Sequence, residues 1–437
     1  MLLWTEFLRC LLALRPACTR ARTFAWMVLV VAGFAARPDL AGVTSFVRGG
    51  WLRAAAYHRL LALFHSSALR LPNLTQAWVR LVLTLFRPVT VGEHLVCLAD
   101  GCKVPKEGRK MPAVKSLHVE SGNNSKPEFI MGHSFQAISL LVHAGLNRMV
   151  AVPLASRIHE GIVTCNANRR SLLDKLADLL SEIAAAVPEH PLLLVADAYY
   201  ASGKLIKPLR EAGHHLVTRV RINAVAYRPA PRPSRPRRGR PRLYGPKVHL
   251  RRLLRASSLY QAAPSPVYGE KNVVLQYRSL DLLWRPARGL IRFVFVKHPT
   301  RGNLILLTTH LELDPLEVIA LYGARFKIEV GFKEAKYTIG AQAYHLLDGR
   351  HEAHPQGLRQ PVPASRVGHL QGPCPAQDGR LPSLRLPGLR RPRPSPAPRR
   401  QLQGRSLGEL SELDAHHEDE RRSQRTRCRG GSPSGPA

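Results

Sequence analysis

The feature that most constrains the fold is an uninterrupted apolar segment, Pro191-Leu-Leu-Leu-Val-Ala196, which runs directly into Asp197. An apolar run of this length predicts a strand that is buried on both of its faces at the centre of a sheet. The chain must therefore supply further strands beside this one and helices that cover both sides of the sheet.

The segments around this strand supply those elements. Strands are expected at 93–100, 135–142, 148–158 and 214–220, and amphipathic or capped helices at 168–187 and 202–212. The resulting order, strand-strand-strand-helix-strand-helix-strand, is that of an RNase H-like α/β core.

Two of the predicted strands end in an aspartate, Asp100 and Asp197. Either residue alone is explained equally well as a turn former or a helix cap. A third carboxylate, Glu329, lies in a helix that we expect to begin at Asp314, with Pro315 in the first helical position. Three carboxylates at one sheet edge need counter-charge, and such clusters commonly hold divalent cations.

The helix that carries Glu329 has an unusual polar face. Tyr322, Arg325, Glu329 and Lys336 fall within roughly 60° of arc on a continuous helix. Taken alone, this face is explained by solvent exposure and an Arg325–Glu329 ion pair. Its spacing, however, resembles the Tyr-Arg-Glu-Lys signature of bacterial insertion-sequence DDE transposases of the insertion-sequence-4 group.

The resemblance continues around both aspartates, through Asp100–Lys110 and the segment Ala196-Asp-Ala-Tyr-Tyr-Ala-Ser-Gly203, with departures at Cys102 and Ala198. It implies that the catalytic and metal-binding residues are Asp100, Asp197 and Glu329, with Mg²⁺ as the cofactor and Mn²⁺ as an alternative. It further implies that Tyr322, Arg325 and Lys336 position DNA phosphates, and Lys333 is a further candidate DNA contact.

The charge balance agrees with a polyanionic partner. The chain has 65 Lys and Arg against 30 Asp and Glu, a formal net charge of +35. We expect double-stranded DNA (terminal repeats and target), a homodimer in the synaptic complex, and a bacterial cytoplasmic protein associated with the nucleoid. The longest apolar run, Phe24–Ala36, is too short to cross a membrane, so no membrane is expected. The seven scattered cysteines predict no structural zinc site.

Five regions are predicted. Residues 1–88 form a helical, DNA-end-binding domain; 89–225 form the first part of the core; 226–301 form a basic loop and a β-rich insertion; 302–347 contain a core strand and the Glu329 helix; and 348–437 form a disordered tail. The basic loop alternates Arg and Pro, and its candidate DNA contacts are Arg237, Arg238, Arg240 and Arg242. Strands are expected at 272–283, 290–297 and 302–310.

The segment 351–437 is the least compatible with a folded core, because it contains 13 Pro and 15 Arg but no Ile, Phe, Tyr or Trp. We interpret it as the product of a frameshift or truncation, with a basic disordered arm as the alternative. The sequence therefore favours a DDE transposase that cuts and pastes DNA, whose activity the altered end puts in doubt. It leaves open a non-catalytic DNA-binding remnant and an RNase H-like nuclease.

Overall fold

The structure is a computed structural model. It describes residues 2–344, apart from 37–41, 51, 107–110, 112, 119–127, 146–147, 160–169, 232–238, 240–241, 257–258 and 342. The predicted tail, and with it the frameshift interpretation, lies outside the described residues.

The N-terminal part is helical, as predicted. Buried residues such as Phe46, Leu60 and Met27 hold these helices together in two small apolar clusters. The last helix also reaches the sheet, where Trp78 donates a hydrogen bond to the carbonyl of Pro153 at 2.7 Å. The helices are α1 Leu2–Ala13, α2 Ala21–Ala36, α3 Val43–Gly49, α4 Ala56–Phe64 and α5 Leu71–Leu85. Within the described part of the chain, no helix combines the length and the apolar character that a bilayer span requires.

The first half of the sheet surrounds the apolar segment that the sequence places at its centre. The segment forms β7, Leu192–Ala196, and all five of its residues are fully buried. The remaining elements of this half are β1 Arg87–Pro88, β2 Thr90–Val91, β3 His94–Pro105, β4 Lys115–His118, β5 Phe129–His143, β6 Met149–Ile158, α6 Leu172–Ala184, η3 Ala198–Tyr200, α7 Gly203–Glu211 and β8 His215–Val220. The predicted order of strands and helices is confirmed.

The second half of the chain extends the same sheet. Its elements are β9 Val225–Pro229, β10 Tyr244–His249, α8 Leu250–Arg255, β11 Gln261–Pro264, β12 Val274–Trp284, β13 Gly289–His298, β14 Gly302–Thr308, α9 Pro315–Ala324 and α10 Lys327–Tyr337. The three predicted strands correspond to β12, β13 and β14. The structure adds β9, β10, α8 and β11, which sequence reasoning did not predict. The β-rich segment continues the core sheet, because β14 pairs with β8 on one side and with β13 on the other.

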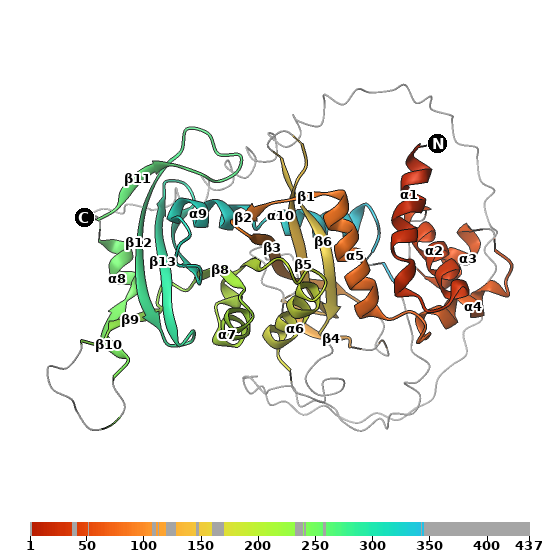
Figure 1. Cartoon of the computed structure of the whole chain (residues 1–437), viewed down its shortest axis with the longest axis horizontal. Coiled ribbons are helices and arrows are strands. Elements are labelled where there is room, and N and C mark those ends of the chain that lie inside the picture. The colour runs from red at the N-terminus through yellow and green to blue at the C-terminus, as the bar shows by residue number, and fades with distance from the viewer. Residues whose placement is uncertain are drawn as a thin grey trace, which may run out of the picture. The chain divides into compact units, whose positions relative to one another are not determined.

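The sheet is covered by helices on both faces (Figure 1). Its order is β1-β5-β3-β7-β8-β14-β13-β12-β9-β10, with β6 paired to β5. Alternate residues of β3 and β7 enter different cores: Leu95, Cys97 and Ala99 pack in the layer that contains α6 and α7. Their neighbours Val96 and Leu98 pack in the layer that contains α9 and α10.

Two predicted boundaries are wrong. The strand expected to end at Asp100 continues to Pro105, because the long strand β5 keeps pairing with β3 up to Pro105↔Gly132. The helix expected over 168–187 begins only at Leu172. Ser171 has extended backbone angles and caps the helix, while Asp174 accepts hydrogen bonds from the backbone and side chain of Ser171.

This cap of α6 gives a stability prediction. Ser171→Ala should lower the free energy of unfolding by about 1 kcal/mol, the usual cost of losing an N-cap. Ser181→Ala is the matched control, since Ser181 lies on the same helix and bonds only the carbonyl of Ala177 within it. Denaturant unfolding of the two variants measures the difference, and equal stabilities would contradict the assignment.

The same cap makes the effect pH-dependent. Hydrogen bonds from Ser171 hold the pKa of Asp174 below its usual value. A depressed folded pKa stabilises the protein above the unfolded pKa of about 4, and this contribution is lost as the pH falls through the folded pKa. The difference between wild type and Ser171→Ala should therefore narrow below about pH 4.

Candidate active site

The two predicted aspartates lie side by side on neighbouring parallel strands. The pairing of β3 with β7 ends at Ala99↔Ala196, and each aspartate is the next residue of its chain. Side chains alternate along a strand, so Asp100 and Asp197 face the same side as Leu98 and Val195, toward the layer of α9 and α10. Parallel register therefore brings together two residues that are 97 positions apart in the sequence.

Asp197 is held at the start of the turn η3 by its backbone and contacts α9 through its side chain. Its carbonyl accepts a hydrogen bond from the hydroxyl of Thr218 at 2.7 Å. Its carboxylate accepts one from the hydroxyl of Tyr322 at 3.3 Å. Burial and the neighbouring charge of Asp197 raise the pKa of Tyr322 to about 12, so this phenol remains a hydrogen-bond donor at neutral pH.

Arg325 connects the other two predicted carboxylates. Its Nη1 donates to Oδ2 of Asp100 at 2.8 Å, and its Nη2 donates to Oε1 of Glu329 at 2.8 Å. The side chains of Arg325 and Asp100 are 18% and 20% exposed, whereas that of Glu329 is 54% exposed. The guanidinium is therefore partly shielded from water, and Glu329 forms the open side of the cluster.

The charges of the cluster influence one another. Burial raises the pKa of Asp100, and the charges of Glu329 and Asp197 act in the same direction. The backbone N–H of Gly101, which donates to Asp100 at 2.7 Å, and the guanidinium of Arg325 oppose this rise. Burial alone would lower the pKa of Arg325, but Asp100 and Glu329 raise it, so the cation stays charged.

The single helix predicted from Asp314 through Lys336 is wrong in one respect. Asp314 caps α9 as predicted, by accepting hydrogen bonds from the N–H groups of Leu316 and Glu317. The helix then tightens at Arg325 and Phe326, where hydrogen bonds run between residues three apart, such as Glu329 N to Phe326 O at 3.0 Å. Both residues keep right-handed helical angles, so α10 continues the path and Glu329 stays within reach of Arg325.

The carboxylates suit a divalent cation chemically, since Asp100, Asp197 and Glu329 offer only hard oxygen donors. Among the described residues, however, the ligand oxygens of the three carboxylates are not close enough to one another to hold one metal ion together. The guanidinium of Arg325 lies between Asp100 and Glu329 and supplies the positive charge there. A cation shared by these two carboxylates therefore requires Arg325 to move aside.

The other predicted DNA contacts are distributed differently. Lys333 and Lys336 are exposed on α10, one and two turns after Glu329 and on its side of the helix. Arg242 is exposed beside β10, at the far end of the strand order from β3. Arg237, Arg238 and Arg240 lie outside the described residues. The structure thus brings Asp100, Asp197, Glu329, Tyr322 and Arg325 together, but not Arg242.

Sequence reasoning missed two residues beside Asp100. The hydroxyl of Tyr200 donates to Oε1 of Gln136 at 2.6 Å, and this buried pair lies against Gly101. A Cβ at Gly101 would come within 3.1 Å of Gln136, so the glycine leaves room for the pair. Burial and the charge of Asp100 raise the pKa of Tyr200, which stays neutral. The signal was a tyrosine three residues after Asp197, but nothing local indicated its partner.

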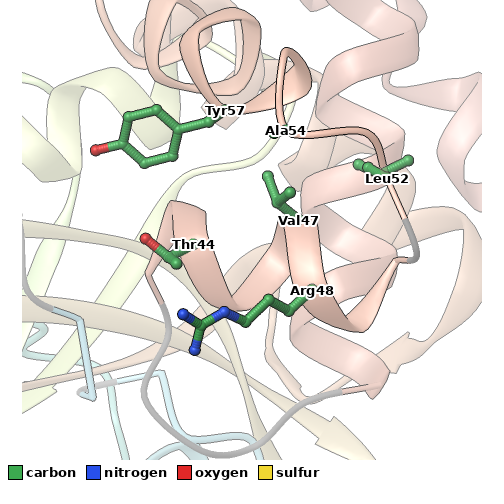
Figure 2. A pocket seen from close by; sticks show the side chains of 6 residues that line it. All are labelled: Thr44, Val47, Arg48, Leu52, Ala54 and Tyr57. Carbon is green, nitrogen blue, oxygen red and sulfur yellow. The ribbon is translucent and has the colours of Figure 1, made fainter.

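A pocket lies in the helical part of the chain, between α3 and α4. Figure 2 shows its lining, which comprises Thr44, Val47, Arg48, Leu52, Ala54 and Tyr57. These six residues include one cation and two hydroxyls but no carboxylate, thiol or imidazole. This pocket therefore offers a place to bind an anionic or polar group, and the acidic cluster remains the candidate for chemistry.

Comparison with known proteins supports an endonuclease. The model of the family described as "DDE superfamily endonuclease" matches residues 13–267, a segment that contains Asp100 and Asp197 and ends before Glu329. No curated protein matches the chain.

One solved structure with detectable similarity is the cryo-EM structure of a piggyBac transposase synaptic complex with hairpin DNA. The identity is 14% and the TM-score 0.33, over 74% of this chain and 63% of that one. This chain thus spans less than two thirds of that protein, and a likeness this weak defines neither fold nor function. The family match covers more than half of the 437 residues, and the chain therefore belongs to the DDE superfamily endonucleases.

Proposed function

We propose that this chain is a DNA transposase of the insertion-sequence-4 type, which cleaves phosphodiester bonds at transposon ends and joins them to target DNA. The observation that carries the proposal is the convergence of Asp100 and Asp197, from adjacent parallel strands, with Glu329 through Tyr322 and Arg325. Family membership as a DDE endonuclease supports the same reaction class.

The strand order around the cluster supports an RNase H-like core. Starting from the outer strand, the order is β6-β5-β3-β7-β8, with β5 antiparallel to β3 and with β3, β7 and β8 parallel. Asp197 follows the end of β7, and it lies beside Asp100 of β3 at the point where the pairing of these two parallel strands ends. Ligands of open α/β sheets bind at such strand ends.

In this proposal Asp100, Asp197 and Glu329 hold Mg²⁺, with Mn²⁺ as a substitute. When bound, two such ions activate the attacking oxygen and stabilise the leaving one. Arg325 leaves the carboxylates and turns to a DNA phosphate, for which its planar fork of donors is suited. Tyr322 stays protonated and donates a hydrogen bond, while Lys333 and Lys336 contact the backbone further along the DNA.

The DNA is proposed to extend from α10 over the basic surfaces of the chain. The helical residues 1–88, in which Arg48 lines a pocket (Figure 2), are assigned to the transposon end. The Arg-Pro loop that includes Arg242 is assigned to a neighbouring groove of the DNA. The large positive charge supports DNA as the partner. A homodimer in the synaptic complex and association with the bacterial nucleoid complete the proposal.

Replacing Glu329 tests the chemical role of the cluster. Glu329→Gln should lower Mg²⁺-dependent cleavage and strand transfer at least about 100-fold, because it removes a charged ligand while preserving shape. Glu334→Gln is the matched control, since Glu334 is exposed on the same helix and bonds only locally to Thr338. The measurement uses linear DNA that carries the sequences flanking the gene, with joined and hydrolysed products separated on a gel.

The outcomes distinguish the alternatives. Cleavage without joining, and without dependence on the flanking sequences, indicates an RNase H-like nuclease. DNA binding without any cleavage in wild type indicates a non-catalytic remnant and overturns the proposed activity. Retention of full activity in Glu329→Gln contradicts the assignment of the cluster.

The exposed lysines of α10 give a binding prediction. Lys333→Ala and Lys336→Ala should each weaken DNA binding and reduce the slope of log K against log salt by about 1, as expected for one lost phosphate contact. Lys207→Ala on α7, which covers the opposite face of the sheet, should leave the slope unchanged. Fluorescence anisotropy without Mg²⁺ measures both. Equal slopes in all variants would remove α10 from the interface.

A further inference from the structure

A second group of chemistry-bearing residues lies at the other end of the central strands. His94 is the first residue of β3, His215 is the first of β8, and His310 follows β14 by two residues. Their ring centroids are 4.9, 5.1 and 4.5 Å apart. One nitrogen from each ring lies within 4.8 Å of the other two. The group is half-buried, so water and small ions can reach it.

This histidine group is separate from the acidic cluster. Asp100 follows His94 by six positions along β3, which corresponds to roughly 20 Å along a strand. The histidines surround the beginning of β7, because β3 and β8 flank that strand at Leu95↔Leu192 and Leu193↔His215. The histidine group therefore lies at the N-terminal ends of β3 and β8, whereas the acidic cluster lies toward the C-terminal ends of β3 and β7.

Neighbouring groups orient two of the three rings. Nδ1 of His215 lies 3.2 Å from the hydroxyl of Thr309, which itself accepts the N–H of Leu216 at 2.9 Å. The ring of His94 is hydrogen-bonded to the backbone of Val91. In the tautomers in which these ring N–H groups donate, the second nitrogen of each ring presents its lone pair. Metal-binding histidines are commonly oriented in this way.

The surroundings also favour uncharged imidazoles. Burial, followed by the nearby His310 and His94, lowers the pKa of His215 to about 4. Burial and His310 lower the pKa of His94. Among other charged or titratable groups, Arg210 and His214 also lower the pKa of His215, whereas Glu93 raises that of His94. Neutral imidazole is the form that binds metals.

We propose that His94, His215 and His310 form a binding site for a transition-metal dication, with Zn²⁺ as the preferred ion. Bonds of 2.0–2.1 Å in a tetrahedral site place ligand nitrogens roughly 3.4 Å apart. Rotation of the imidazole rings about their side-chain torsions can shorten the distances between the ligand nitrogens to this value. The open side of the group leaves the fourth position to water.

The site has a structural role in this proposal. His310 precedes Asp314, the cap of α9, by four residues, so an ion bound here ties the approach to α9 to the starts of β3 and β8. These elements carry or flank all three carboxylates of the acidic cluster. The proposal stands independently of the transposase assignment, because it uses none of the residues of that cluster.

The test uses the full chain, freed of metal, with Zn²⁺ and then Co²⁺ as probes. Zn²⁺ should bind with one tight site per chain and raise the thermal midpoint, and Co²⁺ should give the intense visible spectrum of tetrahedral nitrogen coordination. His310→Ala and His94→Gln should each weaken Zn²⁺ binding at least about tenfold. His143→Ala, an exposed histidine at the end of β5, is the matched control.

Two further measurements make the outcome decisive. Glu329→Gln should bind Zn²⁺ at this site as wild type does, so failure of the acidic-cluster assignment and failure of this proposal are distinguishable. Thermal midpoints without metal show that the histidine variants fold. If wild type lacks a tight Zn²⁺ site, or if the folded variants bind Zn²⁺ as wild type does, the histidines are only a packed aromatic group and the proposal is overturned.

Discussion

The candidate active site depends on the register of one pair of parallel strands. The hydrogen bonds between β3 and β7 end at Ala99 and Ala196, and the next residue of each strand is an aspartate that faces the same helical layer. A shift of one residue in either strand would turn one aspartate toward the opposite core, among the apolar residues of α6 and α7. The alternation that buries Val96, Leu98, Leu193 and Val195 therefore also fixes where the acidic cluster forms.

The cluster has an electrostatic cost, and Arg325 offsets it in this structure. Asp100 is partly buried near two other carboxylates, which disfavours its charged form. The guanidinium contacts Asp100 and Glu329 at 2.8 Å, and Glu329 lies one helical turn after Arg325. Arg325 is thus an internal counter-ion whose place a divalent cation can take. In the proposed function, such an exchange would couple metal binding to the release of Arg325 toward a DNA phosphate.

The sequence predicted the elements whose signals are local. The apolar run of β7 and the cap at Asp314 required only periodicity and capping rules, whereas the choice of Asp100, Asp197 and Glu329 rested also on the resemblance to a known family. The continuation of β3 beyond Asp100 was not predictable in this way, because it depends on β5, whose partner residues lie some 30 positions later. The Tyr200–Gln136 pair and the three histidines depend likewise on contacts between distant segments. No window of sequence contains both members of such a contact.

The long segment between Asp197 and Glu329 forms part of the core sheet, which its length alone does not indicate. Residues 226–301 were expected as a basic loop and an insertion, but their strands extend the core sheet, and the chain returns to the core through β14 beside β8. β14, which precedes α9 and α10 in the chain, pairs with β8 of the core and with β13 of the extension. Glu329 thus follows, through α9, the strand that rejoins the core, and the histidine group lies at that same junction. In the proposed metal site, an ion bound by the three histidines would influence Glu329 through α9, without contacting the acidic cluster.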